Sequence, residues 1–279
     1  QRYFKRGLTW NKLGTVHFAV KYKKEGYIFD DTSRSAFPQE GIELFYLVGV
    51  LCSCVSSHYL EALNPTMSFT NGDIIRIPVC FCNDGKRECI NKIVENNVII
   101  SKSDWDSFEL SWNYKKHPLV KLAKKTIYKN NEKSSYRIVD AFFWWENECN
   151  TRFHNLKANE EELNRIFIDI YGLQDELTPE VKDKDVTVRK ADLSRDIRSF
   201  ISYAVGCTFG RYSLDQEGLM FAGGDMKDAY AYYGGTFADT ANIRLDGKYT
   251  FGEWGTPFYY SQVDGKEPLE CWKVDADNI

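Results

Sequence analysis

A long apolar periodicity between residues 140 and 171 constrains the fold of this chain more than any other sequence feature. Apolar residues recur at helical spacing and form one stripe, made of Leu163, Ile166, Phe167, Ile170 and Tyr171. Leu156 extends the stripe one heptad upstream, and Gly172 directly after it is typical of a helix end. The pattern predicts one long helix, or two abutting ones, whose stripe other elements must cover.

The first eighty residues carry the β-strand signals. Residues 15–23 alternate, with Val16, Phe18, Val20 and Tyr22 predicted to face one side of a half-buried strand and His17, Ala19, Lys21 and Lys23 the other. Tyr27, Ile28 and Phe29 are predicted to return as its partner strand. Residues 41–63 form an apolar helix that ends before Asn64 and Pro65, and residues 68–79 read as two short strands around the Asn71-Gly72 turn.

The rest of the chain is predicted to be mainly helical. Helices are expected over 84–97 and 101–112, and an acidic connector over 173–190. Asp192 is predicted to cap a helix that runs through Phe209. Its buried face is expected to hold Ile197, Ile201, Ala204, Val205 and Phe209. The fold class is therefore α+β, with a small β-containing portion over 1–83, a helical spacer over 84–175 and an α-rich C-terminal domain over 176–279.

Composition supports a packed protein without a membrane span or a metal. The hydrophobic content of 43% and aromatic content of 15% suffice for a core. The longest apolar run, 44–55, is shorter than the roughly 20 residues that a membrane span needs. With no signal peptide, the eight cysteines are expected to be free thiols in a reducing cytoplasm. A zinc site at Cys80, Cys82 and Cys89 is disfavoured, because no Cys-x2-Cys pair is present.

Charge is distributed unevenly around a net value of −4. The first 24 residues contain seven Lys or Arg and no acid, and residues 111–131 contain six Lys and no acid. Residues 140–186 and 213–279 each contain twelve acids against five bases. A polyanion would be attracted to the first two segments and repelled by the last two. Solvated surface runs are the alternative interpretation of these charges.

Duplex DNA is one polyanion that the first segment would attract. Arginine can bind guanine edges or phosphates, and serine hydroxyls suit phosphate oxygens, so the Ser33-Arg34-Ser35 segment is the leading candidate. An ordinary polar turn is the alternative. The residues predicted to bind DNA are Arg2, Lys5, Arg6, Lys12, Lys21, Lys23, Ser33, Arg34 and Ser35.

No catalytic constellation is predicted. Asn64-Pro65-Thr66-Met67 superficially matches the tetrapeptide of adenine methyltransferases, but Met67 cannot stack on a flipped base as an aromatic ring does. The Glu180-Val181-Lys182 segment offers half of a nuclease motif, yet it lies in a connector without converging carboxylates. The four histidines are scattered along the chain.

Ordered motifs lie across most of the chain, at 4–10, 27–30, 33–37, 63–66, 72–74, 163–173, 177–181, 185–189, 198–207, 210–213 and 275–279. In this order they resemble a known family, the PglX adenine-specific DNA methyltransferases of BREX phage-exclusion systems, which are related to fused type IIG restriction-modification enzymes. The family's Asn-Pro-Pro-Tyr signature and its glycine-rich cofactor turn do not occur here. The resemblance implies that residues 1–83 are the C-terminal part of a target-recognition domain.

The resemblance also sets the expected partners. They are duplex DNA, an upstream methyltransferase domain of the same parent chain, and other BREX proteins. S-adenosylmethionine would bind the parent enzyme and not this part, which is expected to be inactive alone. A protein-interaction module with little DNA contact is the main alternative function. A carbohydrate- or peptide-binding domain that uses the aromatics between Tyr230 and Tyr260 is another.

Overall fold

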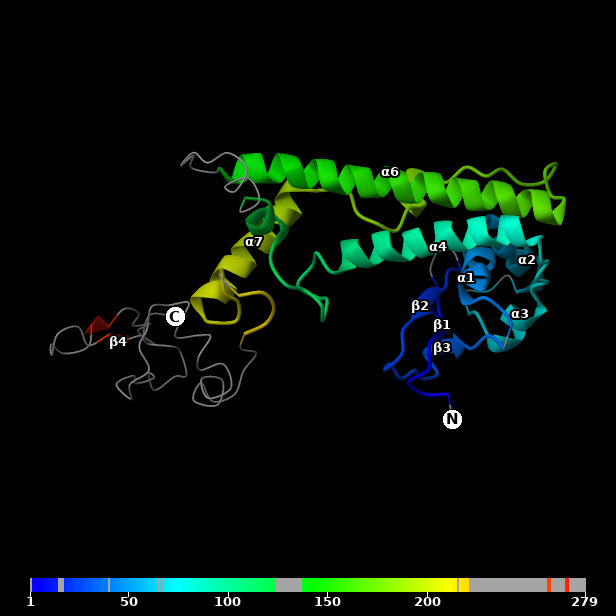
Figure 1. Cartoon of the computed structure of the whole chain (residues 1–279), viewed down its shortest axis with the longest axis horizontal. Helices are drawn as coiled ribbons and strands as arrows, with labels where there is room; N and C mark the ends of the chain where they lie inside the picture. The colour runs from blue at the N-terminus through cyan, green and yellow to red at the C-terminus, as the bar shows by residue number, and fades with distance from the viewer. Residues whose placement is uncertain are drawn as a thin grey trace. The chain divides into compact units, whose positions relative to one another are not determined.

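The computed structural model describes residues 2–14, 18–39, 41–64, 66, 68–123, 137–214 and 216–220, together with the backbone of 260–261 and 269–270. Helices predominate, and the first strands, β1 (Gly7–Asn11), β2 (Lys21–Lys23) and β3 (Ser33–Ala36), form an antiparallel sheet in the order β2-β1-β3 (Figure 1). Strands β4 (Tyr260–Ser261) and β5 (Leu269–Glu270) pair with each other. The predicted α+β class is confirmed.

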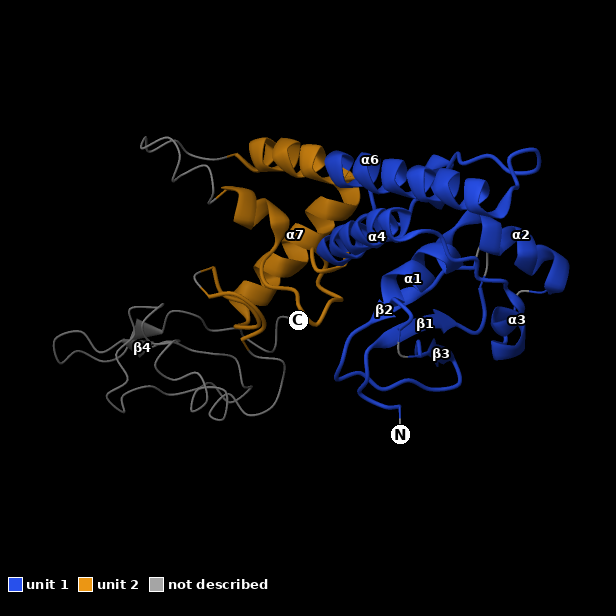
Figure 2. Ribbon diagram, turned by 45° about the vertical axis from the view of Figure 1, so that its right-hand side comes forward, with its two compact units in different colours: residues 1–104, 150–189 blue, residues 105–149, 190–279 orange. Residues whose placement is uncertain are grey.

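The chain forms two compact units, and each is built from two separate stretches. Unit 1 comprises residues 1–104 and 150–189, and unit 2 comprises residues 105–149 and 190–279 (Figure 2). The predicted helical spacer, 84–175, therefore contributes residues to both units. The functional division at residues 83 and 175 stays a prediction.

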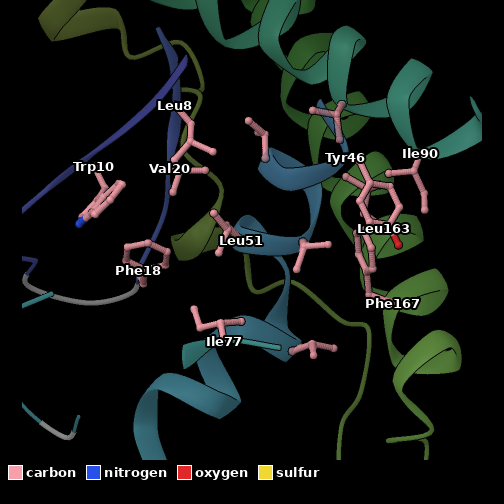
Figure 3. Packing of buried hydrophobic residues seen from close by; sticks show 14 of the residues in the cluster. Leu8, Trp10, Phe18, Val20, Tyr46, Leu51, Ile77, Ile90, Leu163 and Phe167 are labelled. Atoms are coloured by element: carbon pink, nitrogen blue, oxygen red, sulfur yellow. The ribbon is translucent and has the colours of Figure 1, made fainter. Parts of the chain in front are cut away.

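The core of unit 1 lies where helix α1 (Leu44–Cys52) meets α4 (Asp84–Trp105) and the second half of α6 (Ile138–Tyr171) (Figure 3). Phe167 on α6 is fully buried, and its ring lies edge-on to that of Tyr46, with the ring centroids 5.8 Å apart. Gly49 permits this close packing, because a Cβ there would lie 3.0 Å from Val94 and 3.3 Å from Phe167. The apolar stripe of α6 is thus covered by α1 and α4.

The predicted helix over 41–63 is two helices, α1 and α2 (Cys54–Leu63), although it ends before Asn64 as expected. Ser53 between them is extended, and the hydroxyls of Ser53 and Ser56 both donate to the carbonyl of Val50. Such side-chain bonds compete with the helix ladder. Asn164 of α6 stabilises the break, since its Oδ1 accepts from the Cys54 amide at 2.9 Å.

Among the described residues, no single helix combines the length and the hydropathy that a membrane crossing requires. Helices α1 and α2 satisfy both criteria only when counted together, across a bend of 65°.

Two β-strand predictions in unit 1 are wrong. The segment around Asn71-Gly72 is helix α3 (Asn71–Arg76), because Thr70 and Asp73 form a reciprocal capping box that outweighs the hairpin signal. The predicted strand over 27–29 is irregular, and the second partner of β1 is instead β3. Of the strand predicted over 15–23, residues 21–23 form β2 and residues 18–20 are irregular, while residues 15–17 lie outside the described residues.

The helical spacer shows one confirmed and one incorrect prediction. Helix α6 is a single element over the predicted range, and Gly172 ends it with φ +67°, a conformation that glycine adopts without strain. The predicted pair of helices over 84–97 and 101–112 is instead one helix, α4, followed by turns. The acidic connector after Gly172 contains the short 3-10 helix η1 (Asp183–Asp185).

Unit 2 is organised around α7 (Leu193–Thr208), which begins at the predicted cap. The side chain of Asp192 accepts from the Arg195 amide at 2.6 Å. The predicted buried face is wrong, because Asp196, Tyr203 and Gly206 are buried whereas Ile201 and Val205 are at least half exposed. A polar interaction decides the orientation: Trp145 of α6 donates its indole N–H to Asp196 Oδ2 at 3.0 Å.

His117 gives unit 2 a pH-dependent stability. The imidazole is 3% exposed and packs against Phe200 and Tyr203. Burial lowers the pKa of His117 from 6.5 to about 4, although the nearby carboxylates of Asp196 and Glu109 oppose the shift. The unfolded chain binds this proton below pH 6.5 and the folded chain does not until about pH 4. Stability is therefore lost as the pH falls through this window.

We expect the free energy of unfolding to fall by about 2 kcal/mol through His117 between pH 7.5 and pH 5. Urea denaturation of the chain at the two pH values measures this change. His117→Asn is the matched variant, because asparagine can still accept from the Leu119 amide as the imidazole Nδ1 does. If the variant shows the same loss of stability as the wild type, another group is responsible.

Candidate nucleic-acid interface

The register of the sheet sorts the predicted DNA-binding residues onto two faces. Directly paired residues in an antiparallel sheet share a face. Trp10 is buried in the core, so its partner Arg34 leaves β3 on the core side. Thr9 points away from the core with its partners Lys21 and Ser35. The predicted residues are thus not one continuous row.

Arg34 lies at the edge of the sheet with its guanidinium held in place. Its Nη2 is 3.1 Å from Asp31 Oδ1, and its Nη1 donates to Asn71 Oδ1 at 3.4 Å. The side chain is 18% exposed, and its Nε is buried without a hydrogen-bond partner in the described structure. Asn71 reaches this position because α3, rather than the predicted hairpin, occupies residues 71–76.

Asp31 joins Arg34 to a second predicted cation. Lys12 Nζ lies 2.6 Å from Asp31 Oδ2, and the Asp31 side chain is 71% exposed. The hydrogen bond from Lys12, together with the positive charges of Lys12 and Arg34, lowers the pKa of Asp31. The Asp31 carboxylate therefore stays charged at neutral pH and forms ion pairs with both Lys12 and Arg34.

The two serines beside Arg34 are engaged or enclosed. Ser33 Oγ donates to Asp30 Oδ1 at 2.8 Å, within a turn in which that oxygen also accepts from the amides of Thr32 and Ser33. The Thr32 hydroxyl also donates to this oxygen and contributes most to the shift. Together these hydrogen bonds lower the pKa of Asp30 to about 2. Ser35 Oγ is buried and has no hydrogen-bond partner in the described structure. The Ser33 hydroxyl is thus bonded within the chain, and the Ser35 hydroxyl is shielded from solvent.

A second group of cations lies at the other end of the sheet. Lys5 and Arg6 directly precede β1, and Lys24 directly follows β2, so the pairing of Gly7 with Lys23 brings them together. All three side chains are exposed, as are Arg2 and, at the opposite end of β2, Lys21. We call residues 2–6 and 24–28 the basic tip.

Lys23 is the exception among the predicted DNA-binding lysines. It is 6% exposed, and its Nζ donates to the carbonyls of Lys5 and Tyr27. Phe29 and Phe37 cover the ammonium group at 6.0 and 5.4 Å from their ring centroids. The alternation of residues 15–23 correctly places Lys23 on the face away from the core. The alternation alone does not predict that Phe29 and Phe37, which come later in the sequence, cover Lys23.

Sequence reasoning missed Asp31 and Asn71, which hold Arg34. The Asp-Asp-Thr-Ser run at 30–33 is a turn signal that would have placed a carboxylate close to Arg34. Asn64 is used structurally, since its Nδ2 donates to Ser68 O and Asp73 Oδ2, both at 2.7 Å. Over the described ranges, no three His, Cys, Asp or Glu side chains are grouped in a way that would hold a metal ion.

Comparisons with known proteins find similarity to one part of larger proteins. No family model matches the chain. The chain is 42% identical over 229 residues to the adenine-specific methyltransferase PglX of Lacticaseibacillus casei (strain Zhang), covering 82% of the chain and 18% of that protein. It is 29% identical over 242 residues to the adenine-specific methyltransferase BrxX of Escherichia coli O9:H4 (strain HS), covering 79% of the chain.

The chain spans about a fifth of the length of these curated relatives, 18% in each case. Identity of 42% extends over four fifths of the chain, so the match includes residues of both units. The chain belongs to the family of the PglX adenine-specific methyltransferases, as a counterpart of one part of those proteins.

Proposed function

We propose that this chain contributes DNA target recognition to an adenine-specific methyltransferase of a BREX phage-defence system, acting in the cytoplasm. The observation that carries the proposal is the group of exposed cations on unit 1. Lys5, Arg6 and Lys24 gather at one end of the sheet, and Lys21 begins strand β2. The first 24 residues of the chain contain no acid. Such a group attracts the phosphate backbone of a duplex irrespective of its sequence.

Methyl transfer itself would require another part of the same protein. In the whole enzyme, S-adenosylmethionine would supply a methyl group to the exocyclic amine of an adenine that has been flipped out of the duplex. We propose that the residues for this step lie upstream, in the part of the relatives that this chain does not match. This chain would then position the target, and would neither bind the cofactor nor methylate DNA by itself.

Arg34 is suited to reading bases because its guanidinium is already oriented. Asp31 and Asn71 hold two of its nitrogens, so that little side-chain entropy remains to be lost when the group binds a planar acceptor pair. The O6 and N7 atoms of guanine form such a pair. Lys12, on the other oxygen of Asp31, would reach a phosphate.

A chimaera tests target recognition directly. This chain would replace the matching segment of the Lacticaseibacillus casei PglX, and methylated adenines would be mapped across a genome. We expect the chimaera to methylate a different motif from that of the parent. Arg34→Ala in the chimaera should then relax target choice, with a cost of about 1–3 kcal/mol at the preferred site and little elsewhere.

Lys12→Ala is the matched control for that experiment, because it removes the other cation bound to Asp31. It should weaken methylation of all sites about equally, as expected for a phosphate contact. A chimaera that keeps the parental motif contradicts target recognition by this chain. An unchanged motif in Arg34→Ala contradicts base reading by Arg34 alone.

Docking of another phage-defence protein is the second candidate function, and one observation on unit 2 favours it. Helix α7 and its C-cap residue Phe209 expose apolar side chains four or eight residues apart: Leu193, Ile201, Val205 and Phe209 are each between 46% and 56% exposed. Exposed apolar stripes are typical of partner surfaces. The aromatics between Tyr230 and Tyr260 that could bind carbohydrate or peptide lie outside the described side chains.

A further inference from the structure

Phe4 adopts a backbone conformation that its residue type disfavours. Its φ is +65°, and among the described residues it is the one non-glycine residue with a positive φ. In this region the Cβ of an L-residue crowds the following carbonyl, a strain that glycine avoids. The ring is also 60% exposed, so burial does not compensate for the strain. A strained residue with an exposed aromatic ring is unfavourable for stability and points to a binding role.

The strained backbone is fixed from both sides. The Phe4 amide donates to Tyr27 O at 3.2 Å, and the Phe4 carbonyl accepts from the Gly26 amide at 2.9 Å. Below them, the buried Lys23 ammonium donates to the carbonyls of Lys5 and Tyr27 and so ties the two loops of the basic tip together. The Phe4 backbone, and with it the direction of the Cα–Cβ bond, is therefore set by the fold.

The surroundings of Phe4 define the chemistry of its partner. Tyr27 and Ile28 in the facing loop are 54% and 69% exposed. Exposed Lys5, Arg6 and Lys24 belong to the same two loops as these apolar groups, and Glu25 is the single carboxylate in the basic tip. Exposed apolar side chains with cations beside them in the chain fit a partner that is anionic outside and offers flat apolar faces inside. A nucleic acid duplex has this construction, and proteins that kink DNA insert apolar side chains between base steps.

We propose that Phe4 inserts its ring between two base pairs of bound duplex DNA, while Lys5, Arg6 and Lys24 hold the flanking phosphates. The proposal rests on the proposed function, because it requires the basic tip to contact DNA. It adds that the chain distorts the duplex, so that easily unstacked pyrimidine–purine steps are preferred at a position where no side chain need read a base edge. Fixing the Phe4 backbone before binding reduces the conformational freedom lost on insertion.

The test uses the full 279-residue chain and duplexes that carry 2-aminopurine at a TA step, whose emission rises when the base is unstacked. Binding is measured separately by anisotropy of an end label. Wild type is expected to bind and to raise 2-aminopurine emission several-fold. Phe4→Ala should keep binding within about tenfold and lose the emission change, because the phosphate contacts remain. Phe4→Trp should retain both signals.

Two further variants separate insertion from effects on the fold. Phe4→Gly accepts the positive φ without strain, so its melting temperature should rise while the emission change is lost. It carries the test if Phe4→Ala fails to fold. Trp112→Ala removes a fully exposed aromatic ring in unit 2 and should change neither signal.

Each outcome bears on a different claim. Binding by wild type without any emission change, or an emission change that persists in Phe4→Ala and Phe4→Gly, overturns insertion by Phe4 and leaves the proposed function standing. Absence of binding by folded wild type at low salt overturns the proposed function, and the insertion with it. Loss of the emission change in Phe4→Ala and Phe4→Gly, with binding retained, supports insertion.

Discussion

Reversing Lys5, Arg6 and Lys21 to glutamate is expected to abolish measurable binding of the chain to duplex DNA. The three side chains are exposed; Lys5 and Arg6 directly precede β1, and Lys21 begins the neighbouring strand β2. Each reversal replaces an attraction to phosphate with a repulsion, and each phosphate contact contributes about 0.9 to the slope of log affinity against log salt. Fluorescence anisotropy with a labelled duplex, at about 50 mM salt and above, measures both the affinity and the slope.

A matched triple variant controls for net charge, which affects DNA binding at a distance. Lys182, Lys184 and Arg198 are exposed as well, and their reversal to glutamate changes the net charge by the same amount. We expect this variant to bind DNA nearly as well as wild type. If both triple variants lose binding to the same extent, the effect comes from overall charge and the DNA-binding face lies elsewhere.

Phe167→Ala is expected to destabilise unit 1 by about 3–5 kcal/mol, a large share of the stability of a typical domain. Phe167 is fully buried, and it fills the space between Tyr46 and the Gly49 backbone. Removal of the ring leaves a cavity that α1 and α4 cannot close, because they already pack at contact distance around Gly49. Urea denaturation monitored by circular dichroism gives the free energy of unfolding.

Phe143→Ala on the same helix is the control for Phe167→Ala. Its ring is 60% exposed, so the identical substitution should change the free energy of unfolding by no more than about 0.5 kcal/mol. A loss below about 1 kcal/mol for Phe167→Ala would mean that the unit 1 core repacks around the missing ring, contrary to the packing described here.

Local signals in the sequence predicted the helices that begin at a capping residue or end at a glycine. The heptad spacing and Gly172 fixed α6, and Asp192 fixed the start of α7. The predictions failed where two local signals compete, as at residues 70–73, where the capping box outweighs the Asn-Gly turn. The buried face of α7 was not predictable from hydrophobicity, because the indole N–H of Trp145, far away in sequence, selects Asp196.

The candidate site shows the same division between local and distant causes. Composition identified the cationic first segment, and most of its lysines and arginines are indeed exposed. The burial of Lys23 depends on Phe29 and Phe37, and the orientation of Arg34 depends on Asn71. Phe29 and Phe37 lie in loops, and Asn71 lies in α3, where the sequence pattern predicted two strands around a turn. Which cations remain available to DNA is therefore decided by tertiary structure.

The discontinuity of unit 1 has a consequence for synthesis on the ribosome. Helix α1 leaves the ribosome with an apolar face whose partner, Phe167, is more than a hundred residues away in the sequence. At the usual elongation rates of about 5–20 residues per second, the apolar face of α1 stays uncovered for roughly 6–24 s before α6 is synthesised. During this interval chaperones can bind the face, and the nascent chain can aggregate through it. In a protein truncated at residue 104 or 149, the face would stay uncovered.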